Sequence, residues 1–364
     1  MKTKIIKMKL GKDSYPIIIG VNILGSIASY LPKNTSKIII VSDERLTVKR
    51  KELLKTLKKL SIPIVEIAVK AGEGLKNIKA VYPLYGKLLK AQADRDSIII
   101  ALGGGSIGDA VGFVAATYMR GINWIGVPTT LLAQVDSSVG GKTGINHEAG
   151  KNLIGAFHQP RLVVCDVNYL KSLGPREKVS GLGEIIKYSL TFDKKFFKWL
   201  EKNLASVLKG SPEFLSFAIE KSVEKKCRAV SKDVEDRLGM REVLNFGHTF
   251  GHALESSTNY NKFQHGEAVI WGMRFALALS EVRGKITTKK RKQMDQLLSK
   301  LNVPSIPKSL SKEAIFNHMK KDKKSQGNVI RFVLLDDVGH SFSDAKVTKN
   351  DLDQAFYAIT GRKI

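Results

Sequence analysis

The hydrophobic pattern of the 364-residue chain changes at Leu173-Gly174-Pro175. Before this point, short runs rich in isoleucine and valine alternate with amphipathic segments. Strands are predicted at 37–43, 63–69 and 96–102; a helix that runs through Leu60 follows the first, and a helix over about 77–91 follows the second. Strands that alternate with helices indicate parallel pairing through crossover connections. We therefore expect an α/β nucleotide-binding domain with a parallel sheet over residues 1–174.

After Pro175 the apolar residues recur with the 3.6-residue period of amphipathic helices almost throughout. The predicted elements are helices at 176–190, 194–208, 211–230, 241–256 and 265–283, and one late strand at 329–335. This pattern predicts a second, mainly α-helical domain over residues 175–364.

The chain carries 60 Lys and Arg against 34 Asp and Glu, a formal net charge of +26. Clustered cations can indicate nucleic-acid binding, but these lysines lie along predicted helices, and no nucleic-acid motif accompanies them. The charge therefore favours a basic surface with a site for an anionic small molecule. We expect no nucleic-acid partner.

Other features bear on the location of the protein. No run of 18 apolar residues is present, and Met1–Leu10 lacks the apolar stretch of a signal peptide. Cys165 and Cys227 are the two cysteines, and they stand outside any CxxC pattern, which is typical of a reducing compartment. We expect a cytoplasmic protein with no membrane partner.

A glycine-rich turn, Gly103-Gly-Gly-Ser-Ile-Gly-Asp109, follows the third predicted strand and opens a helix that continues to about Met119. Glycines let the backbone approach a phosphate, and the N-terminus of a helix offers unpaired N–H groups. A tight turn without a ligand is the alternative; the flanking strand and helix favour a pyrophosphate site. Asp43, at the end of the first of these strands, can accept hydrogen bonds from a ribose or cap a helix.

Residues 127–152 combine glycines, hydroxyl and amide side chains and two lysines, without the period of a helix or strand. We interpret them as a long irregular functional segment. Lys142 and Lys151 beside hydroxyls and amides suit a phosphorylated, hydroxylated substrate, and Asp136 can orient one of these lysines. A solvated loop, the alternative, accounts neither for the glycines nor for Val135 and Val139.

The second domain contains a candidate metal site. His248 and His252 are four residues apart and therefore share a helix face, His265 begins the next helix, and Glu184 lies on an earlier one. Two histidines and a carboxylate with an open position form a catalytic zinc pattern. A single helical histidine is more often a hydrogen-bonded structural residue. Spacing alone makes His248 and His252 the natural pair and leaves open which three residues bind.

Together these blocks resemble the 3-dehydroquinate synthase family over nearly the whole chain. The matching blocks are 103–109, Tyr118-Met-Arg-Gly121, 128–146, 150–155, Glu184-Ile-Ile-Lys-Tyr188, 244–255 and His265-Gly-Glu-Ala-Val269. Gly183 and Ser189 depart from the pattern, because related sequences usually carry Ala and Gly there.

The resemblance implies a role for each matching residue. It implies that Glu184, His248 and His265 bind one divalent metal, Zn²⁺ or Co²⁺, which leaves His252 for the substrate. The implied contacts to NAD come from Asp43, Glu73, Lys76, Gly104, Gly105, Gly108, Asp109, Thr129, Thr130, Lys142, Lys151, Tyr169, Leu170, Lys171 and Ser172. The implied catalytic and substrate-binding residues are Asp136, Lys142, Asn152, Lys187, Arg241, Asn245 and His252.

Three further positions follow from the same resemblance. Arg120 matches a residue that reaches across the interface of a homodimer. Lys226 matches a family lysine if one residue is inserted before Arg241, and otherwise Cys227 takes that position. A second family lysine falls on Lys323, with Lys324 as the alternative.

The implied activity is that of a lyase of the shikimate pathway of aromatic amino-acid biosynthesis, acting on a sugar-phosphate acid. It converts 3-deoxy-D-arabino-heptulosonate 7-phosphate to 3-dehydroquinate and phosphate, by transient oxidation with NAD, β-elimination, re-reduction, ring opening and intramolecular aldol closure. The alternatives are another sugar-phosphate cyclase, a metal-dependent NAD polyol dehydrogenase and a non-enzymatic basic binding protein.

Overall fold

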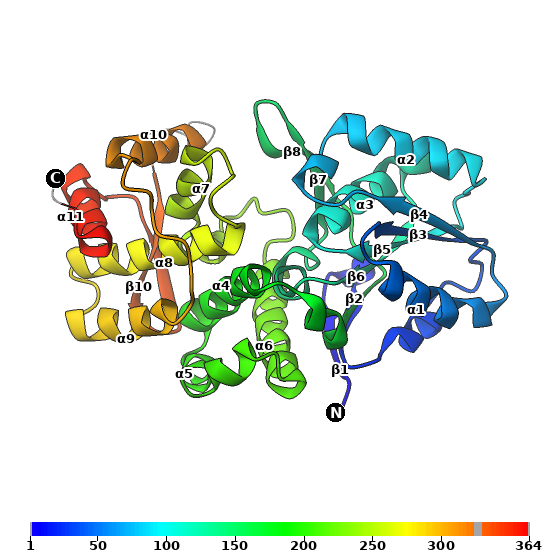
Figure 1. The fold of residues 1–364 in the computed structure, drawn as a ribbon, viewed down its shortest axis with the longest axis horizontal. Helices are drawn as coiled ribbons and strands as arrows, with labels where there is room; N and C mark the ends of the chain where they lie inside the picture. Colours follow the sequence, from blue (N-terminus) through cyan, green and yellow to red (C-terminus); the bar gives the residue numbers. More distant parts are fainter. Residues whose placement is uncertain (1, 324–329, 363–364) are drawn as a thin grey trace. The chain divides into compact units, whose positions relative to one another are not determined.

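The computed structural model describes residues 2–323 and 330–362, and it divides the chain into two compact units (Figure 1). Unit 1 comprises Met1–Leu173 and Gly210–Glu235, and unit 2 comprises Gly174–Lys209 and Asp236–Ile364. The first division falls where the sequence pattern changes. Residues 210–235, expected in the helical domain, belong to unit 1, because α6 (Pro212–Val230) packs there against the sheet strands β1 and β2. Periodicity predicts a helix but does not tell which partner its apolar face has.

Unit 1 is built on a seven-stranded sheet in the order β1-β2-β9-β6-β5-β3-β4. The neighbouring strands pair in parallel, apart from β1, which is antiparallel to β2 at one edge. This confirms the predicted α/β class. The strand bounds are β1 Lys4–Met8, β2 Tyr15–Gly20, β3 Ile38–Asp43, β4 Ile64–Val69, β5 Ile98–Gly103, β6 Asn123–Pro128 and β9 Leu162–Asp166.

The central strands are apolar on both faces, since helices cover both sides of the sheet. Ile38 and Ile40 pack into one cluster, with Leu53 of α1 (Thr47–Leu57). Ile39 packs into the opposite cluster, with residues of α2 (Ile78–Lys90) and α3 (Gly105–Thr117). Because successive strand side chains point to opposite faces, a continuous isoleucine run satisfies both layers.

The parallel strands place their carboxyl ends at one edge of the sheet. Ser42 of β3 pairs with Leu102 of β5, and Gly103 of β5 pairs with Pro128 of β6. Asp43 and the glycine-rich turn therefore emerge from neighbouring strands at the same edge. In open α/β sheets ligands bind at this edge.

The segment 127–152 is more regular than the sequence predicts. After β6 it forms a π-helix, η6 (Ala133–Ser137), and then the antiparallel hairpin of β7 (Lys142–His147) and β8 (Gly150–Phe157). Gly144 and Gly155 pair across the hairpin, and a Cβ added to Gly144 would lie 2.7 Å from Ile154 O. The glycines that permit this close approach also remove the β-branched signal from which a strand is predicted.

Unit 2 is mainly helical, as predicted. Its elements are α4 Pro175–Phe192, α5 Lys194–Leu208, α7 His248–Ser257, α8 His265–Val282, α9 Thr288–Ser299, α10 Lys312–Lys323, α11 Lys349–Thr360 and the hairpin of β10 (Phe332–Asp337) and β11 (His340–Asp344). The helix expected over 241–256 is interrupted. The short 3-10 helix η8 covers Glu242–Asn245, Gly247 has a φ of +81°, and α7 begins at His248.

Close contacts hold α4 and α8 together inside unit 2. A Cβ added to Gly183 would lie 2.8 Å from Gly266 O. The glycine at this position, where related sequences usually carry Ala, therefore permits the close contact of the two helices. Among the helices of the described residues, none is both long and apolar enough to cross a membrane.

Candidate active site

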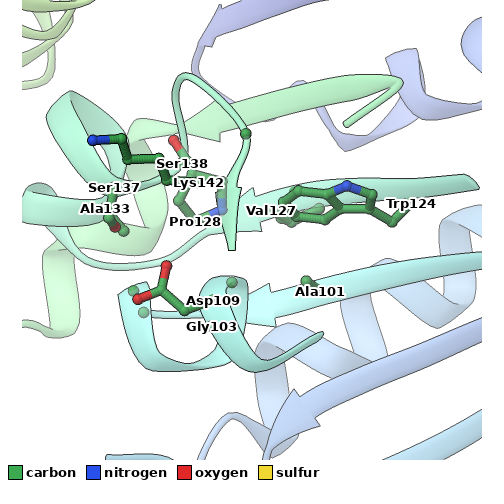
Figure 2. A pocket seen from close by; sticks show the side chains of 15 residues that line it. Ala101, Gly103, Asp109, Trp124, Val127, Pro128, Ala133, Ser137, Ser138 and Lys142 are labelled. Atoms are coloured by element: carbon green, nitrogen blue, oxygen red, sulfur yellow. The ribbon is translucent and has the colours of Figure 1, made fainter. Parts of the chain in front are cut away.

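The glycine-rich turn joins β5 to α3 and borders a pocket in unit 1 (Figure 2). Gly104 is extended at the N-cap of the thirteen-residue α3, and a Cβ added to Gly105 would lie 2.9 Å from Ser137 Oγ. In Figure 2 the Asp109 carboxylate and Gly103 lie on one side of the pocket, and Ser138 and Lys142 on the other. The turn thus presents backbone N–H groups and a helix N-terminus to a concave surface, as an anion requires.

Five of the residues expected at NAD or substrate are joined by polar contacts beside this pocket. Lys76 is 5% exposed; its Nζ donates to Asp109 Oδ2 at 2.7 Å and also bonds Asn152 Oδ1. Glu73 lies 3.9 Å from Lys151, measured from Oε1 to Nζ. Burial raises the pKa of Asp109, and the Lys76 charge opposes that rise. The structure therefore brings together side chains from three separate segments.

Asn146 links these segments, although the sequence assigned it no role. Its Nδ2 donates to Glu73 Oε1 at 2.7 Å, and its Oδ1 accepts from Asn152 N at 2.9 Å. Asn152 has a φ of +56°, a conformation that asparagine tolerates better than most residues. The sequence signal that could have indicated a role for Asn146 was the crowding of amide side chains in the 127–152 segment.

Other expected NAD residues lie along the same sheet edge. Asp43 ends β3, is 5% exposed and is not a helix N-cap, because Leu46 stands at the N-cap of α1. Thr129 N donates to Gly103 O at 2.9 Å, and Thr130 Oγ1 accepts from Ala133 N at 3.2 Å. The stretch Tyr169–Ser172 lies in the 3-10 helix η7 (Val167–Ser172), after β9.

Asp136 is paired with a lysine from outside its own segment. Lys226 of α6 is 7% exposed, and its Nζ donates to Asp136 O at 2.6 Å and to Asp136 Oδ1 at 2.8 Å. Asp136 thus contacts a lysine that is ninety residues away in sequence. Burial raises the pKa of the neighbouring Cys227 to about 12, so that thiol stays neutral. This pairing favours Lys226 over Cys227 for the family position.

Arg120 is not among the residues that make these contacts. Arg120 is exposed at the end of the 3-10 helix η5 (Tyr118–Arg120), with a φ of +68°. Lys323 ends α10, but its side chain lies outside the described part of the chain, as does all of Lys324.

In unit 2, Glu184 and Lys187 lie one turn apart on α4, where they are 0% and 2% exposed. Lys187 Nζ forms an ion pair with Glu184 Oε2. Glu184 Oε1 accepts no hydrogen bond from any residue that the structure describes. A buried carboxylate oxygen without a hydrogen bond is costly, which points to a cationic ligand.

Two imidazoles face this oxygen. His248 Nε2 lies 3.6 Å from Glu184 Oε1, and His265 Nε2 lies 3.9 Å from it, beyond hydrogen-bonding distance in both cases. Ligands that bind a tetrahedral Zn²⁺ at about 2 Å lie about 3.3 Å from one another, so these separations suit a shared ion. The two other ring nitrogens are engaged: His248 Nδ1 lies 3.3 Å from Phe246 O, and His265 Nδ1 lies 3.2 Å from Glu255 Oε2.

These outer contacts are typical of metal-binding histidines. A carbonyl or carboxylate that accepts from Nδ1 holds the proton there and leaves Nε2 as the metal ligand. Burial above all, together with the Lys187 charge, lowers the pKa of His248, which favours the neutral imidazole that a metal requires. Glu184, His248 and His265 therefore fit a divalent ion.

His252 belongs to the same cluster. Its ring centroid lies 5.3 Å from that of His248 and 5.7 Å from that of His265, and each of the three histidines offers a nitrogen within 4.8 Å of the others. A set of three histidines is therefore also compatible with the geometry. The exposed side chain of His252 and the unbonded Glu184 Oε1 favour the set with Glu184.

The remaining expected residues of unit 2 precede α7. Arg241 is 4% exposed at the start of η8, and Asn245 is exposed at its end. The sequence assigned no role to Glu255, although it lies seven residues after His248 and three after His252, and therefore on their helix face. This spacing could have indicated that Glu255 lies beside the histidine cluster.

The two halves of the chain match family models in order. The model described as 3-dehydroquinate synthase N-terminal matches residues 66–180, and that described as 3-dehydroquinate synthase C-terminal matches residues 181–325. The 3-dehydroquinate synthase of Hydrogenovibrio crunogenus is 43% identical over 342 residues, which are 93% of this chain and 95% of that relative.

Solved structures share the fold. A 2-deoxy-scyllo-inosose synthase complexed with carbaglucose-6-phosphate, NAD⁺ and Co²⁺ has a TM-score of 0.87 at 26% identity, over 98% of this chain and 99% of that one. ValA, a 2-epi-5-epi-valiolone synthase from Streptomyces hygroscopicus with NAD⁺ and Zn²⁺ bound, has a TM-score of 0.88 at 23% identity, over 96% and 97%. With both family models matched in order and a relative that is similar over nearly its full length, the chain belongs to the 3-dehydroquinate synthase family.

Proposed function

We propose that this protein is a 3-dehydroquinate synthase, which converts 3-deoxy-D-arabino-heptulosonate 7-phosphate to 3-dehydroquinate and phosphate. Membership of the family supports the reaction class. The observation that carries the proposal is the arrangement of Glu184, His248 and His265, whose inner atoms face one another while the outer imidazole nitrogens are held by a carbonyl and a carboxylate.

The cofactors in this proposal are NAD and one divalent metal ion, Zn²⁺ or Co²⁺. Two solved neighbours carry NAD⁺ with one of these metals. The turn at Gly104, Gly105, Gly108 and Asp109 suits the pyrophosphate, and the Glu184 cluster suits the metal. When bound, the nucleotide supplies a reversible hydride acceptor, and the metal supplies Lewis-acid stabilisation of oxyanions.

Within each unit, fixed side chains supply polar and charged groups that suit such a substrate. In unit 1, Lys226 holds Asp136 in a fixed position, and Lys76 holds Asn152. In unit 2, the buried Lys187 and Arg241 supply fixed positive charge for the phosphate, the carboxylate and the negative charge that develops during β-elimination. His252, beside the metal cluster, can hold or release a proton near the reacting hydroxyls.

The choice among sugar-phosphate cyclases depends on the carboxylate of the substrate. Glucose 6-phosphate and sedoheptulose 7-phosphate lack the C1 carboxylate that the heptulosonate carries. A positive charge held at a buried position, such as that of Arg241, favours an anionic substrate group over a neutral one. A site built for a polar group of the substrate discriminates by roughly 10⁴ or more against a substrate that lacks this group. We therefore propose the acidic heptulosonate as the substrate.

The test is incubation with the heptulosonate phosphate, Zn²⁺ and a catalytic amount of NAD⁺, followed by identification of the product. We expect phosphate release to exceed the NAD⁺ added, without NADH at the end, because the hydride returns in each cycle. Stoichiometric NADH would instead indicate a polyol dehydrogenase. Efficient turnover of sedoheptulose 7-phosphate would leave only the general cyclase assignment.

Arg241→Ala sharpens the same test. We expect kcat/KM for the acidic substrate to fall by roughly 10⁴, with metal content and NAD⁺ affinity unchanged. The matched control is Arg237→Ala, which removes an exposed arginine four residues earlier. Equal losses in both variants would contradict the proposed role of Arg241.

We also propose that the enzyme is a cytoplasmic homodimer in which Arg120 reaches across the interface. The exposed side chain of Arg120 and its left-handed backbone conformation support this role. Light scattering at micromolar concentration would test the dimer. A monomer that retains full activity would contradict it.

A further inference from the structure

The carboxylate at the end of β3 already has a partner within its own chain. Both oxygens of Asp43 accept from Arg45: Nε lies 3.1 Å from Oδ1 and 3.0 Å from Oδ2, and Nη2 lies 2.7 Å from Oδ2. The Asp43 side chain is 8% exposed, whereas that of Arg45 is 74% exposed. The guanidinium therefore lies on the solvent side of the carboxylate, where a bound nucleotide would approach.

The position of this pair fits the adenosine end of a dinucleotide. β3 is the direct neighbour of β5, and Asp43 follows Ser42, which pairs with Leu102 just before the glycine-rich turn. In dinucleotide-binding sheets, an acidic residue at the end of the strand next to that turn accepts hydrogen bonds from the adenosine ribose. With the pyrophosphate at the turn, we expect the ribose hydroxyls to lie within reach of the Asp43–Arg45 pair.

A carboxylate and an arginine at this place select different nucleotides. A carboxylate binds the 2′-hydroxyl of NAD⁺ and repels the 2′-phosphate of NADP⁺, whereas a nearby arginine accommodates that phosphate. Here the charge of Asp43 is compensated by a two-point ion pair. Guanidinium also binds phosphate through two parallel hydrogen bonds.

Of the two neighbouring cations, Lys49 adds positive charge beside the end of β3, whereas Arg50 is compensated by an ion pair. Arg50 Nη1 donates to Ser42 Oγ at 3.2 Å, and its Nε lies 3.1 Å from Glu66 Oε2. Lys49 Nζ donates to Tyr169 O at 2.7 Å and to Ser172 Oγ at 2.9 Å, in the stretch proposed to contact the nucleotide. All three cations lie within or just before α1, beside the end of β3.

We propose that Arg45 allows this nucleotide site to bind NADP⁺ as well as NAD⁺, because its exposed guanidinium can bind the 2′-phosphate while it compensates the charge of Asp43. The inference rests on the proposed function, because it assumes a dinucleotide at the glycine-rich turn. It adds a specificity-determining residue to that site.

The test compares dissociation constants for NAD⁺ and NADP⁺, measured by isothermal titration calorimetry on the full-length, metal-loaded protein. For the wild type we expect the two constants to agree within about tenfold. For Arg45→Ala we expect the dissociation constant for NADP⁺ to rise by about tenfold or more, since a charge-assisted bond is lost, and that for NAD⁺ to change by less than about threefold. Arg45→Lys should fall between these two cases.

Arg95→Ala is the matched control. Arg95 is also an exposed arginine of unit 1, but it precedes β5 and therefore lies at the opposite edge of the sheet. We expect it to leave both constants unchanged. The inference is overturned if the wild type binds NAD⁺ but not NADP⁺ at millimolar concentration, or if Arg45→Ala weakens both nucleotides equally. If neither nucleotide binds the wild type, the proposed function fails together with the inference.

Discussion

The two sites differ in how their polar groups are satisfied without a ligand. In unit 1, Lys76 links Asp109 to Asn152, and Arg45 pairs with Asp43, so the candidate nucleotide residues hold one another in place. In unit 2, Glu184 Oε1 accepts no hydrogen bond from the described residues, and the Nε2 atoms of His248 and His265 lie too far from it to donate one. The polar groups of the first site are satisfied within the fold, whereas the proposed ion would complete the second.

This difference has an energetic consequence. Burial of an unpartnered carboxylate oxygen lowers the stability of a fold, and an ion that binds only the folded state restores that stability through its binding free energy. Substitutions in unit 2 should therefore act mainly through metal occupancy. Substitutions in unit 1 should act on the fold even when no nucleotide is bound.

Among the substitutions that distinguish the two sites, the largest expected effect is on metal binding in unit 2. Glu184→Gln replaces the anionic ligand by a neutral amide, so we expect bound metal to fall from one ion per chain to near zero. The activity should fall by about a thousandfold or more, since Lewis-acid stabilisation contributes several kcal/mol. Metal content by mass spectrometry and steady-state kinetics check both parts.

His252→Ala decides between the two possible ligand sets. If Glu184, His248 and His265 bind the ion, His252→Ala keeps a full equivalent of metal and loses activity only. His340→Ala is a suitable control, because His340 is an exposed histidine of β11 in the same unit. Metal loss in His252→Ala together with retention in Glu184→Gln would establish the three-histidine set instead.

The sequence predicted the fold best where one local signal decided the structure. β3 and β5 are continuous isoleucine runs because both faces of the sheet are covered, and such runs are recognised directly. The β7–β8 hairpin was not predicted, because the glycines that let its strands approach closely also interrupt the β-branched pattern by which a strand is recognised. The placement of α6 in unit 1 was missed because an amphipathic period does not identify a partner.

The same limit applies to the sites. The glycine-rich turn and the histidine cluster follow local motifs and were predicted. The Lys226–Asp136 pair joins residues ninety positions apart, and only the packing of α6 beside η6 brings them together. Arg45 is two residues from Asp43, but sequence proximity does not show that an exposed arginine folds back onto a strand end.

The next largest expected effect is on the stability of unit 1. Lys76→Met removes the partner of Asp109, whose side chain is 22% exposed, so we expect a cost below the roughly 3 kcal/mol of a fully buried broken pair, on the order of 2 kcal/mol. Hydrogen exchange at β5, α3 and β7 should then become faster without any nucleotide, while α7 and α8 remain unchanged. Lys79→Met, a substitution of an exposed lysine on α2, is the control. Unchanged exchange at α3 in Lys76→Met would contradict the view that these contacts stabilise the fold.

The Lys76→Met penalty should also depend on pH. Burial raises the pKa of Asp109 above its ordinary value of 3.8, and removal of the Lys76 charge raises that pKa further. An acid whose pKa is raised on folding destabilises the fold above its unfolded pKa, and the penalty disappears below that value. We therefore expect a smaller loss of stability at about pH 5 than at about pH 8, measured by thermal melting. A loss that is larger at the lower pH would exclude Asp109 as its source.

The smallest expected effect concerns Glu255, which acts on the metal through His265. Glu255 is 5% exposed, and its Oε2 lies 3.2 Å from His265 Nδ1. Carboxylates in this position fix the orientation of the imidazole and raise its basicity, and their loss typically weakens metal binding by 10- to 100-fold, or about 1.4–2.8 kcal/mol. Glu255→Gln keeps the size of the side chain but removes the charge. We therefore expect metal affinity, measured by chelator competition, to fall within that range, while the melting temperature of the metal-free protein stays within a few degrees.

Glu255→Asp, which retains the charge on a shorter side chain, should recover part of the affinity. A purely structural role predicts the reverse pattern, in which the metal-free protein loses stability and the affinity per folded molecule is unchanged. Because the unit 1 contacts should be insensitive to metal, NAD⁺ affinity in Glu255→Gln should equal that of the wild type, and a parallel loss of both ligands would break the distinction between the two sites.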